Sequence, residues 1–427
     1  MKIIENPKVE NWATLLKRPT PDYASLENDV KAIFKDIKSH GDASVLKYTK
    51  LFDGIELQDM KLSPDELKNA SDTIEPRLKA SIDVAYNNIF KFHSAQEQEE
   101  LKVETQPGVT CWQASKPIQK VGLYIPGGTA PLFSSILMLG IPAKIAGCRE
   151  VILVTPPQKN GKVHPAMLYA AYKCGIKNIY QVGGIQAIAA LTFGTQSIPK
   201  VYKIFGPGNQ YVTVAKQVAT THDVAIDMPA GPSELLVLAD ESANSEYVAS
   251  DLLSQAEHGI DSQVVLITTS RSFAEATKKA LLHQLDKLPR KEIAMKAIEH
   301  SKFIVVKNRE VALRMTNFYS PEHLIICLDN EMEAVKQIEN AGSVFIGNFT
   351  PESAGDYASG TNHTLPTNAF ARQYSGVNLD AFNKKITYQK ITAEGLKHLG
   401  PHVENMSETE QLQAHKNAVT LRLKDIE

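Results

Sequence analysis

Apolar residues recur at helical spacing in the N-terminal part of the chain, which predicts a series of amphipathic helices. The first helix begins after Ser25 and a second begins at Asp42. The segment Ser63–Glu66 combines an N-cap serine, a proline in the first turn and a capping-box glutamate, and it predicts the start of a third helix. A longer helix follows, and its buried face is predicted to carry Leu78, Ile82, Ala85, Ile89 and Phe92.

From Val109 onward the chain changes to short apolar strands that alternate with helices. This alternation predicts parallel sheets that are covered by helices on both faces. The strands fall into two series of similar size, so we predict an α/β protein with two Rossmann-like parallel-sheet domains. The first series comprises Val121–Ile125, Val151–Val154, Ile179–Val182 and Val201–Phe205, and the second comprises Leu235–Leu238, Val264–Ile267, Phe303–Val306, Leu324–Leu328 and Val344–Ile346.

Small helical extensions are expected on either side of these domains. Residues 1–24 are expected to form the N-terminal extension and residues 378–427 the C-terminal extension. Residues 25–119 and 233–377 are assigned to a first, discontinuous α/β domain, and residues 120–232 to a second. The final predicted helix covers residues 407–424, and a terminal helix of this kind generally docks on a neighbouring surface.

The composition narrows the class of protein. The formal net charge is −2 and no basic run is present, which argues against nucleic acid as a partner. The first residues, Met1–Glu5, contain no apolar core of signal-peptide length, and no stretch approaches the uninterrupted apolar length of a membrane span. The cysteines show no CxxC spacing and no neighbouring base, as expected for reduced core thiols in a cytoplasmic protein; they are Cys111, Cys148, Cys174 and Cys327.

The segment around Gln255 and His258 provides the first candidate for a metal site. A helix predicted from Ser242 ends before Gly259, which fits the position of a left-handed cap. On this helix Gln255 and His258 leave the same face, and an amide oxygen beside an imidazole nitrogen can begin a site of mixed oxygen and nitrogen ligands. The alternative is that His258 only complements the helix dipole.

A loop over residues 353–363 also has the composition of a site. It combines two glycines, several hydroxyl side chains, Asp356 and His363, which are poor material for a hydrophobic core. Asp356 would supply a hard oxygen ligand to a metal held by Gln255 and His258.

Two further pairs, each of an acid and a histidine, lie before and after this loop in the chain. Glu322 and His323 are adjacent at the junction of a loop and a strand, so they could act on different sides of one substrate. The alternative for this pair is a solvated position on the surface. Glu410 and His415 lie five residues apart on the final predicted helix, on neighbouring faces.

Two glycine-containing turns, Pro126–Gly128 and Gly206–Asn209, each lie between a predicted strand and a predicted helix. Backbone N–H groups at such helix starts suit phosphate groups. Neither turn has the G-x-G-x-x-G spacing of a dinucleotide fingerprint, so tight turns without a ligand explain them equally well.

Several of these segments together resemble the histidinol dehydrogenase family, in matching order from about Asp42 to the C-terminal part of the chain. The similar segments are Leu252–Gly259, Ser320–Leu324, Ala354–Thr367 and Gln411–Val419, and Gly206–Asn209 and Gly231–Glu234 also fit. The resemblance implies an enzyme of the last steps of histidine biosynthesis, which oxidises L-histidinol through L-histidinal to L-histidine with two NAD and one Zn²⁺ per subunit. It also implies a homodimer in which the C-terminal segment completes the active site of the partner subunit.

The resemblance assigns roles to individual residues. Glu322 and His323 correspond to the acid–base pair. The implied zinc ligands are Gln255, His258, Asp356 and His415. The implied substrate-binding residues are Ser233, Gln255, His258, His323, Asp356, His363, Glu410 and His415, and the residues implied to contact NAD are Tyr124, Gln186 and Asn209.

These residue types suit the implied chemistry. An alcohol oxidation needs a base with a pKa near neutrality, which an imidazole such as His323 provides, and a carboxylate such as Glu322 can draw a proton from the water that hydrates the aldehyde. Zinc would mainly orient the imidazole and amine of the substrate, and activation of its hydroxyl is the alternative. Two other functions use the same residues or the same fold: a zinc hydrolase, and a nucleotide-binding scaffold without catalysis.

Overall fold

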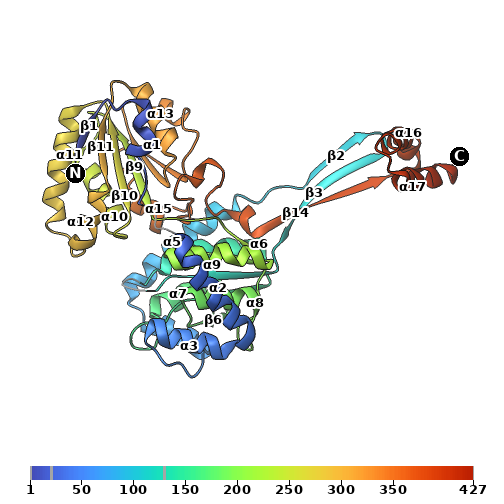
Figure 1. The fold of residues 1–427 in the computed structure, drawn as a ribbon, viewed down its shortest axis with the longest axis horizontal. Helices are drawn as coiled ribbons and strands as arrows, with labels where there is room; N and C mark the ends of the chain where they lie inside the picture. The colour runs from blue at the N-terminus through green and yellow to red at the C-terminus, as the bar shows by residue number, and fades with distance from the viewer. Residues whose placement is uncertain (1, 20–22, 128–130, 427) are drawn as a thin grey trace. The chain divides into compact units, whose positions relative to one another are not determined.

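Figure 1 shows the computed structural model of the chain, which describes residues 2–19, 23–127 and 131–426. These residues form two compact units. The larger unit comprises the chain up to Gln96 together with Ile118–Ala381, and the smaller unit comprises Glu97–Pro117 and the chain from Phe382 onward. Within the described residues, no helix is both long enough and apolar enough to cross a membrane.

The first sheet of the larger unit has five parallel strands in the order β6-β5-β4-β7-β8. This is the doubly wound order, in which the chain starts at a central strand and moves outward first to one side and then to the other. The strands are β4 (Lys120–Tyr124), β5 (Glu150–Val154), β6 (Asn178–Tyr180), β7 (Lys203–Phe205) and β8 (Ala225–Ile226). The connecting helices are α6 (Phe133–Ala146), α7 (Pro165–Cys174), α8 (Gly184–Phe193) and α9 (Gln210–Ala219).

The second sheet has six parallel strands in the order β1-β11-β10-β9-β12-β13. Apart from the edge strand β1, this is again the doubly wound order. The strands are β1 (Ile3–Glu5), β9 (Glu234–Ala239), β10 (Gln263–Thr268), β11 (Lys302–Val305), β12 (His323–Cys327) and β13 (Ser343–Ile346). The helices are α10 (Ser245–Ala256), α11 (Arg271–Leu285), α12 (Lys291–Glu299), α13 (Arg309–Tyr319), α14 (Glu331–Val335) and α15 (Glu352–Tyr357).

Both faces of the six-stranded sheet are buried, which explains its continuous apolar runs. Leu235 and Val237 on one face share a core with residues of α10, α11 and α12. Leu236 and Leu238 on the other face pack with α13 and with Trp12. The predicted fold class, with two Rossmann-like parallel sheets, is therefore confirmed.

The N-terminal extension differs from the helical segment that was expected. Its first element is β1, which adds a parallel edge strand to β11, and only the short helices η1 (Val9–Asn11) and α1 (Trp12–Leu15) follow. A strand of three residues is too short to leave a periodic pattern in the sequence.

Four helices follow this extension: α2 (Tyr23–His40), α3 (Asp42–Asp53), α4 (Pro64–Thr73) and α5 (Pro76–Ser94). Val30, Phe34 and Ile37 on α2 share a core with α8 and α9, while α4 packs on α7 and α5 on α6. This packing on the five-stranded sheet differs from the expected grouping of residues 25–119 with 233–377. An amphipathic pattern shows that a helix has an apolar face, but not which sheet that face covers.

The local predictions for these helices are confirmed, with one exception. The capping box is present, because Ser63 accepts from the backbone of Glu66 and the Glu66 side chain accepts from the backbone of Ser63. On α5, however, Phe92 is 46% exposed, and His93 is buried in the core instead. The His93 Nδ1–H donates to the carbonyl oxygen of Ile89 (2.9 Å), which satisfies this polar ring inside the protein.

The smaller unit consists of an antiparallel sheet and two helices. The sheet has the order β14-β3-β2, with β2 (Leu101–Gln106), β3 (Val109–Pro117) and β14 (Asn383–Ile391), and β14 was not predicted. The expected single helix over residues 407–424 is wrong, because α16 (Ala393–Thr409) and α17 (Gln413–Lys424) are separate helices that pack together. Gln411 between them has a φ of 61°, which ends a right-handed helix.

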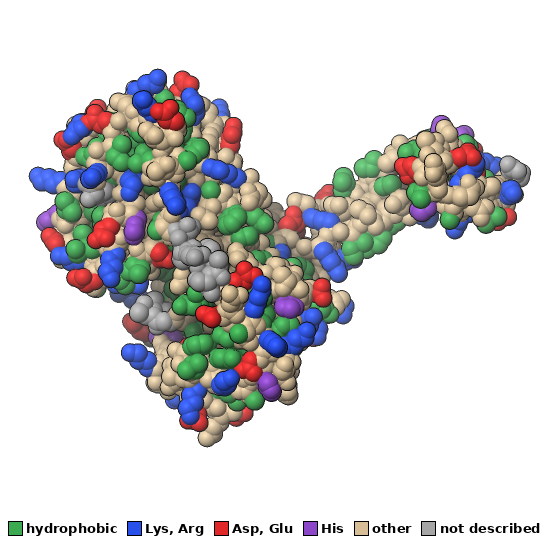
Figure 2. All heavy atoms as spheres, viewed as in Figure 1, with side chains coloured by type: hydrophobic (Ala, Val, Ile, Leu, Met, Phe, Trp, Pro, Cys, Tyr) green, Lys and Arg blue, Asp and Glu red, His purple; other side chains and the backbone are tan. Residues whose placement is uncertain are grey.

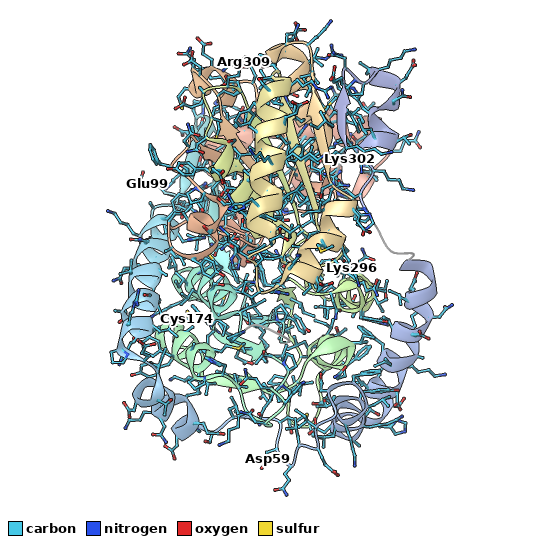
Figure 3. All side chains as sticks on the ribbon, turned by 90° about the vertical axis from the view of Figure 1, so that its left-hand side faces the viewer. Asp59, Glu99, Cys174, Lys296, Lys302 and Arg309 are labelled. Atoms are coloured by element: carbon cyan, nitrogen blue, oxygen red, sulfur yellow. The ribbon has the colours of Figure 1, made fainter. Side chains whose placement is uncertain are left out.

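The remaining 3₁₀ helices are η2 (Thr220–His222), η3 (Phe370–Arg372) and η4 (Leu379–Phe382). On the face of the molecule in Figure 2, side chains of both charges are interspersed, in keeping with the small net charge. None of the four cysteines forms a disulfide within the described residues. Burial raises the pKa of Cys148, Cys174 and Cys327 to about 12, so these three thiols stay protonated and unreactive near neutral pH. Cys174, on α7, is labelled in Figure 3.

Candidate active site

The pair Glu322 and His323 lies at the amino end of β12, next to the amino end of the central strand β9. The preceding Ser320 ends α13 in the left-handed conformation, with a φ of 54°, and turns the chain into the strand. Glu322 is 5% exposed and His323 is 4% exposed. The alternative of a solvated surface pair is therefore excluded.

Three carboxylates surround the imidazole of His323. Its Nδ1 lies 3.6 Å from Glu322 Oε2 and 3.6 Å from Glu352 Oε1, and its Nε2 lies 3.5 Å from Asp356 Oδ1. Burial alone would lower the pKa of His323, but the charges of Glu352, Glu322 and Asp356 outweigh it and raise the pKa well above its usual range. In this environment His323 holds its proton strongly.

Glu352 was missed in the sequence, although it is one turn before Asp356 on α15 and so shares a face with it. Its side chain is 1% exposed, and both carboxylate oxygens lack a hydrogen-bond partner among the described residues. Burial raises the pKa of Glu352 well above its usual range despite the nearby His323. A buried carboxyl group in this state needs either a proton or a cation.

Asp356 behaves in the opposite way. Burial alone would raise its pKa, but the hydrogen-bond contact with His323 and the charge of that ring lower it instead. The lowered pKa favours the ionised form of Asp356, and an ionised carboxylate is a hard ligand for a divalent cation.

The helix that carries Gln255 ends earlier than expected. α10 stops at Ala256, and Gly259 does not have the left-handed conformation that was predicted for a cap. Gln255 is 1% exposed and both atoms of its amide lack a hydrogen-bond partner among the described residues. His258 is exposed beyond the helix end, and α10 packs against α15, which carries Asp356.

These residues fit a divalent metal of mixed ligand type. A buried amide without a partner is rare in proteins, and its oxygen would become a ligand if a cation occupied the space between Gln255, His258 and Asp356. A second possible set consists of His323, Glu352 and Asp356, whose ligand atoms lie within 4.8 Å of one another. The two sets share Asp356, and each contains a buried side chain without a hydrogen-bond partner among the described residues, Gln255 in the first and Glu352 in the second.

His363 and Ser233 lie beside this cluster. The His363 Nδ1–H donates to the carbonyl oxygen of Asp356 (2.9 Å), and Nε2 lies 3.0 Å from the hydroxyl of Ser135 on α6. Burial is the main cause of the lowered pKa of His363, so its ring is neutral near pH 7. Ser233 directly precedes β9, and its carbonyl oxygen accepts from the backbone of Gln263 (3.2 Å). Ser135, which was not expected from the sequence, thus joins a helix of the five-stranded sheet to the cluster.

The residues expected to contact a cofactor line one cleft of 1460 Å³ at the five-stranded sheet. Tyr124 ends β4, Gln186 is in the first turn of α8, and Asn209 caps α9 by accepting from two backbone N–H groups. The cleft lies at the carboxyl ends of these strands, where a doubly wound sheet binds its ligand. Asp53, at the end of α3, also lines the cleft and was not expected.

Polar contacts hold the lining of the cleft. The Tyr124 hydroxyl accepts from the backbone of Gly184 (3.2 Å), and burial raises its pKa to about 12, so it stays neutral. The Gln186 amide donates to Asp53 Oδ2 (3.4 Å), while the amide oxygen lacks a partner among the described residues. Gly127 also lines the cleft; Gly128, the other glycine of that predicted turn, lies outside the described residues.

The second glycine turn is fixed by a buried ion pair. Lys216 donates to the carbonyl oxygen of Gly206 (2.8 Å), and the Gly206 N–H donates to Asp227 Oδ2 (2.8 Å). Lys216 and Asp227 also contact each other, with side chains that are 5% and 1% exposed. Gly206 has a φ of 125° and approaches Tyr124 so closely that a Cβ would lie 2.0 Å from the Tyr124 carbonyl oxygen. Only glycine fits here.

Glu410 and His415 belong to the smaller unit, where both are exposed. Glu410 follows α16 and His415 lies in the first turn of α17. Their proposed place in a shared active site therefore stays a prediction.

Comparisons with known proteins agree on one family. The family model described as histidinol dehydrogenase matches residues 16–423. The histidinol dehydrogenase of Bacteroides thetaiotaomicron is 57% identical over 99% of each chain, and that of Bacteroides fragilis is 56% identical over 100% of each chain. The crystal structure of histidinol dehydrogenase from Elizabethkingia anophelis has a TM-score of 0.97 and 52% identity, and the match covers 100% of this chain and 98% of the other.

Proposed function

The chain belongs to the histidinol dehydrogenase family of oxidoreductases, and we propose that it oxidises L-histidinol through L-histidinal to L-histidine with two NAD in turn. The observation that carries this proposal is the burial of Glu322 and His323 together beside the ionised carboxylate of Asp356. Two buried proton-transfer groups beside an ionised carboxylate suit a reaction that moves protons in two successive steps.

In the first step, the hydroxyl of histidinol loses its proton to His323. The Nε2 atom of His323 has no hydrogen-bond partner among the described residues, so it is the ring atom that receives this proton. When bound, NAD would accept the hydride from the carbon that bears this hydroxyl.

In the second step, Glu322 takes a proton from the water that adds to histidinal, and His323 returns its proton to the aldehyde oxygen, which regenerates the neutral ring. His323 then takes a hydroxyl proton of the hydrated aldehyde as the second hydride leaves. Because Glu322 and His323 are adjacent in the chain, both side chains can act on one substrate.

The metal proposed for this site is zinc, held by Gln255, His258 and Asp356. We expect the fourth ligand to be His415 of the other subunit in a homodimer. When bound, zinc would orient the imidazole and amine of the substrate, and activation of the hydroxyl is the alternative. A cation beside Asp356 also offsets the carboxylates that keep His323 protonated, which suits a histidine that has to act as a base.

We assign the NAD site to the cleft lined by Tyr124, Gln186 and Asn209. The support is its place at the switch point of a doubly wound sheet and the helix N-termini that face it, which favour the cofactor phosphates.

The reaction is tested by supplying L-histidinol and NAD and counting reduced cofactor per histidine formed, with an expected ratio of two. One reduced cofactor per turnover would contradict the second oxidation. No reduction at all would favour a zinc hydrolase or a scaffold without catalysis. Elemental analysis of His258→Asn, with the fold checked by circular dichroism, tests the metal site, because loss of one imidazole ligand should release the zinc.

The shared site is tested by mixing two inactive variants, His258→Asn and His415→Asn. If core and tail come from different chains, each mixed dimer has one intact site of two. Random subunit exchange makes half of the dimers mixed, so about a quarter of the wild-type activity should return. No recovery, with exchange confirmed by mass, would place the tail in the site of its own chain.

A further inference from the structure

Arg18, in the N-terminal segment, binds Glu234, and the backbone of Glu234 contacts the pair Glu322 and His323. Its side chain is 12% exposed and that of its partner Glu234 is 1% exposed. Arg18 Nη2 donates to Glu234 Oε1 (2.8 Å), and Nε donates to Oε2 of the same carboxylate. The guanidinium also donates to the carbonyl oxygen of Tyr319 (2.7 Å) and lies 4.0 Å from the centre of the Tyr319 ring. Arg18 therefore holds both oxygens of Glu234 in one plane.

Glu234 in turn holds Glu322. The Glu234 backbone N–H donates to Glu322 Oε2 (2.9 Å), and the Glu322 backbone N–H donates to Glu234 Oε1 (3.3 Å). The carbonyl oxygen of Glu234 also lies 3.4 Å from His323 Nδ1. Glu234, the first residue of β9, is thus cross-linked to Glu322, the residue that directly precedes the adjacent strand β12.

This arrangement does more than neutralise a buried charge. A lysine would also compensate Glu234, but only the planar fork of an arginine fixes both carboxylate oxygens. A displacement of one of those oxygens would shift the backbone of Glu322 and, through the reciprocal bond, its carboxylate. We propose that Arg18 is a positioning residue that acts through Glu234 to hold the Glu322 carboxylate where it deprotonates water. This inference rests on the function proposed above.

The variant that tests the proposal is Arg18→Lys, which retains the charge. We expect the rate constant for oxidation of added histidinal to fall about 10- to 100-fold, the size of penalty that a displaced catalytic group brings. The oxidation of histidinol to the aldehyde should fall less, and KM for histidinal and Kd for NAD should not change. This is the pattern expected for Glu322→Gln. The matched control is Arg314→Lys. Arg314 is on α13 and lies over the ring of Trp12, which belongs to the same N-terminal segment as Arg18, but Arg314 does not contact Glu234.

A second variant, Glu234→Gln, tests the route of the effect. If Arg18 acts through Glu234, the double variant is no slower than the slower single variant, because both changes interrupt one connection. Multiplied losses would show that Arg18 acts by another route and would overturn the proposal. Unchanged kinetics in Arg18→Lys, or an equal fall of both half-reactions and of NAD affinity together with the melting temperature, would also overturn it. Failure of the wild-type protein to oxidise histidinal would instead overturn the proposed function, on which this inference depends.

Discussion

The two parallel sheets share one strand order but use opposite ends. In the five-stranded sheet the cleft lies at the carboxyl ends of the strands, beside Tyr124 and Asn209. In the six-stranded sheet the buried ionisable groups lie at the amino ends, where Glu234 begins β9 and His323 begins β12. The strand order produces a crevice at the carboxyl ends in both cases, so the loops must decide whether that crevice is used.

The loops at the carboxyl ends of the six-stranded sheet are tied together by their own side chains. Asp240, directly after β9, accepts from the backbone of Ser242 (2.9 Å) and from the backbone of Asp329 after β12 (3.0 Å). The corresponding loops of the five-stranded sheet carry glycine, proline and capping residues that leave backbone N–H groups toward the cleft. One strand order thus presents two candidate ligand positions, and the loops at the carboxyl ends of the two sheets differ in the side chains that they carry.

His323→Asn is the strongest test of whether the cleft of the five-stranded sheet and the cluster at the amino ends of the six-stranded sheet act separately. We expect both half-reactions to slow by about 10²–10⁴-fold, because each needs a proton removed from oxygen. Binding of NAD, measured by fluorescence titration, should be unchanged, because His323 belongs to the six-stranded sheet. Weaker NAD binding in this variant would show that the two ends do not act separately.

The corresponding test for the five-stranded sheet is Lys216→Met on its helix α9. It leaves Asp227 buried without its partner, which should reduce the free energy of unfolding by about 3–5 kcal/mol and weaken NAD binding by loosening the turn at Gly206. Adding Asp227→Asn removes the unpaired charge and should restore much of the stability. Denaturant unfolding and NAD titration measure the two effects, and an unchanged NAD affinity in a folded Lys216→Met protein would contradict the role of the pair.

A pH dependence distinguishes the six-stranded region. Burial raises the pKa of Asp251 on α10 to about 7. The folded state therefore binds a proton that the unfolded state has lost between about pH 4 and pH 7, and Asp251 makes stability fall as pH rises through that range. Asp251→Asn should remove this fall and be more stable than the wild type at pH 8 by about 2 kcal/mol, with a smaller difference at pH 5. A difference that does not change with pH would contradict the raised pKa.

The smallest expected effect is that of Ser63→Ala, which removes the cap of α4; Ser63 neither lines the cleft nor belongs to the cluster around His323. Loss of an N-cap of this kind lowers stability by about 1 kcal/mol. Both half-reactions and NAD affinity should remain at wild-type values. A change in either would mean that general stability, rather than local contacts, controls the two sites.

The sequence predicted the strands of both sheets well, because strands buried on both faces are continuous apolar runs such as Leu235–Leu238. It missed β1 and β8, which are too short to show a period, and β2 and β14, whose residues are mostly exposed. Within the site, Glu322 and His323 were recognisable as neighbours in the chain. Arg18 and Glu234 are far apart in sequence, so only the folded chain shows that they meet.

The pairing of β3 with β14 has a consequence for how the protein is made. The two strands are about 270 residues apart in the chain, so at about 5–20 residues per second β14 is synthesised roughly 15–50 s after β3. Throughout that interval the hairpin of β2 and β3 has both edges open, and an isolated hairpin is only marginally stable. Leu101 and Val103 on β2 are exposed even in the completed fold. The nascent chain on the ribosome therefore exposes unpaired strand edges at this hairpin until β14 has been made, and open edges of this kind are sites where aggregation can begin.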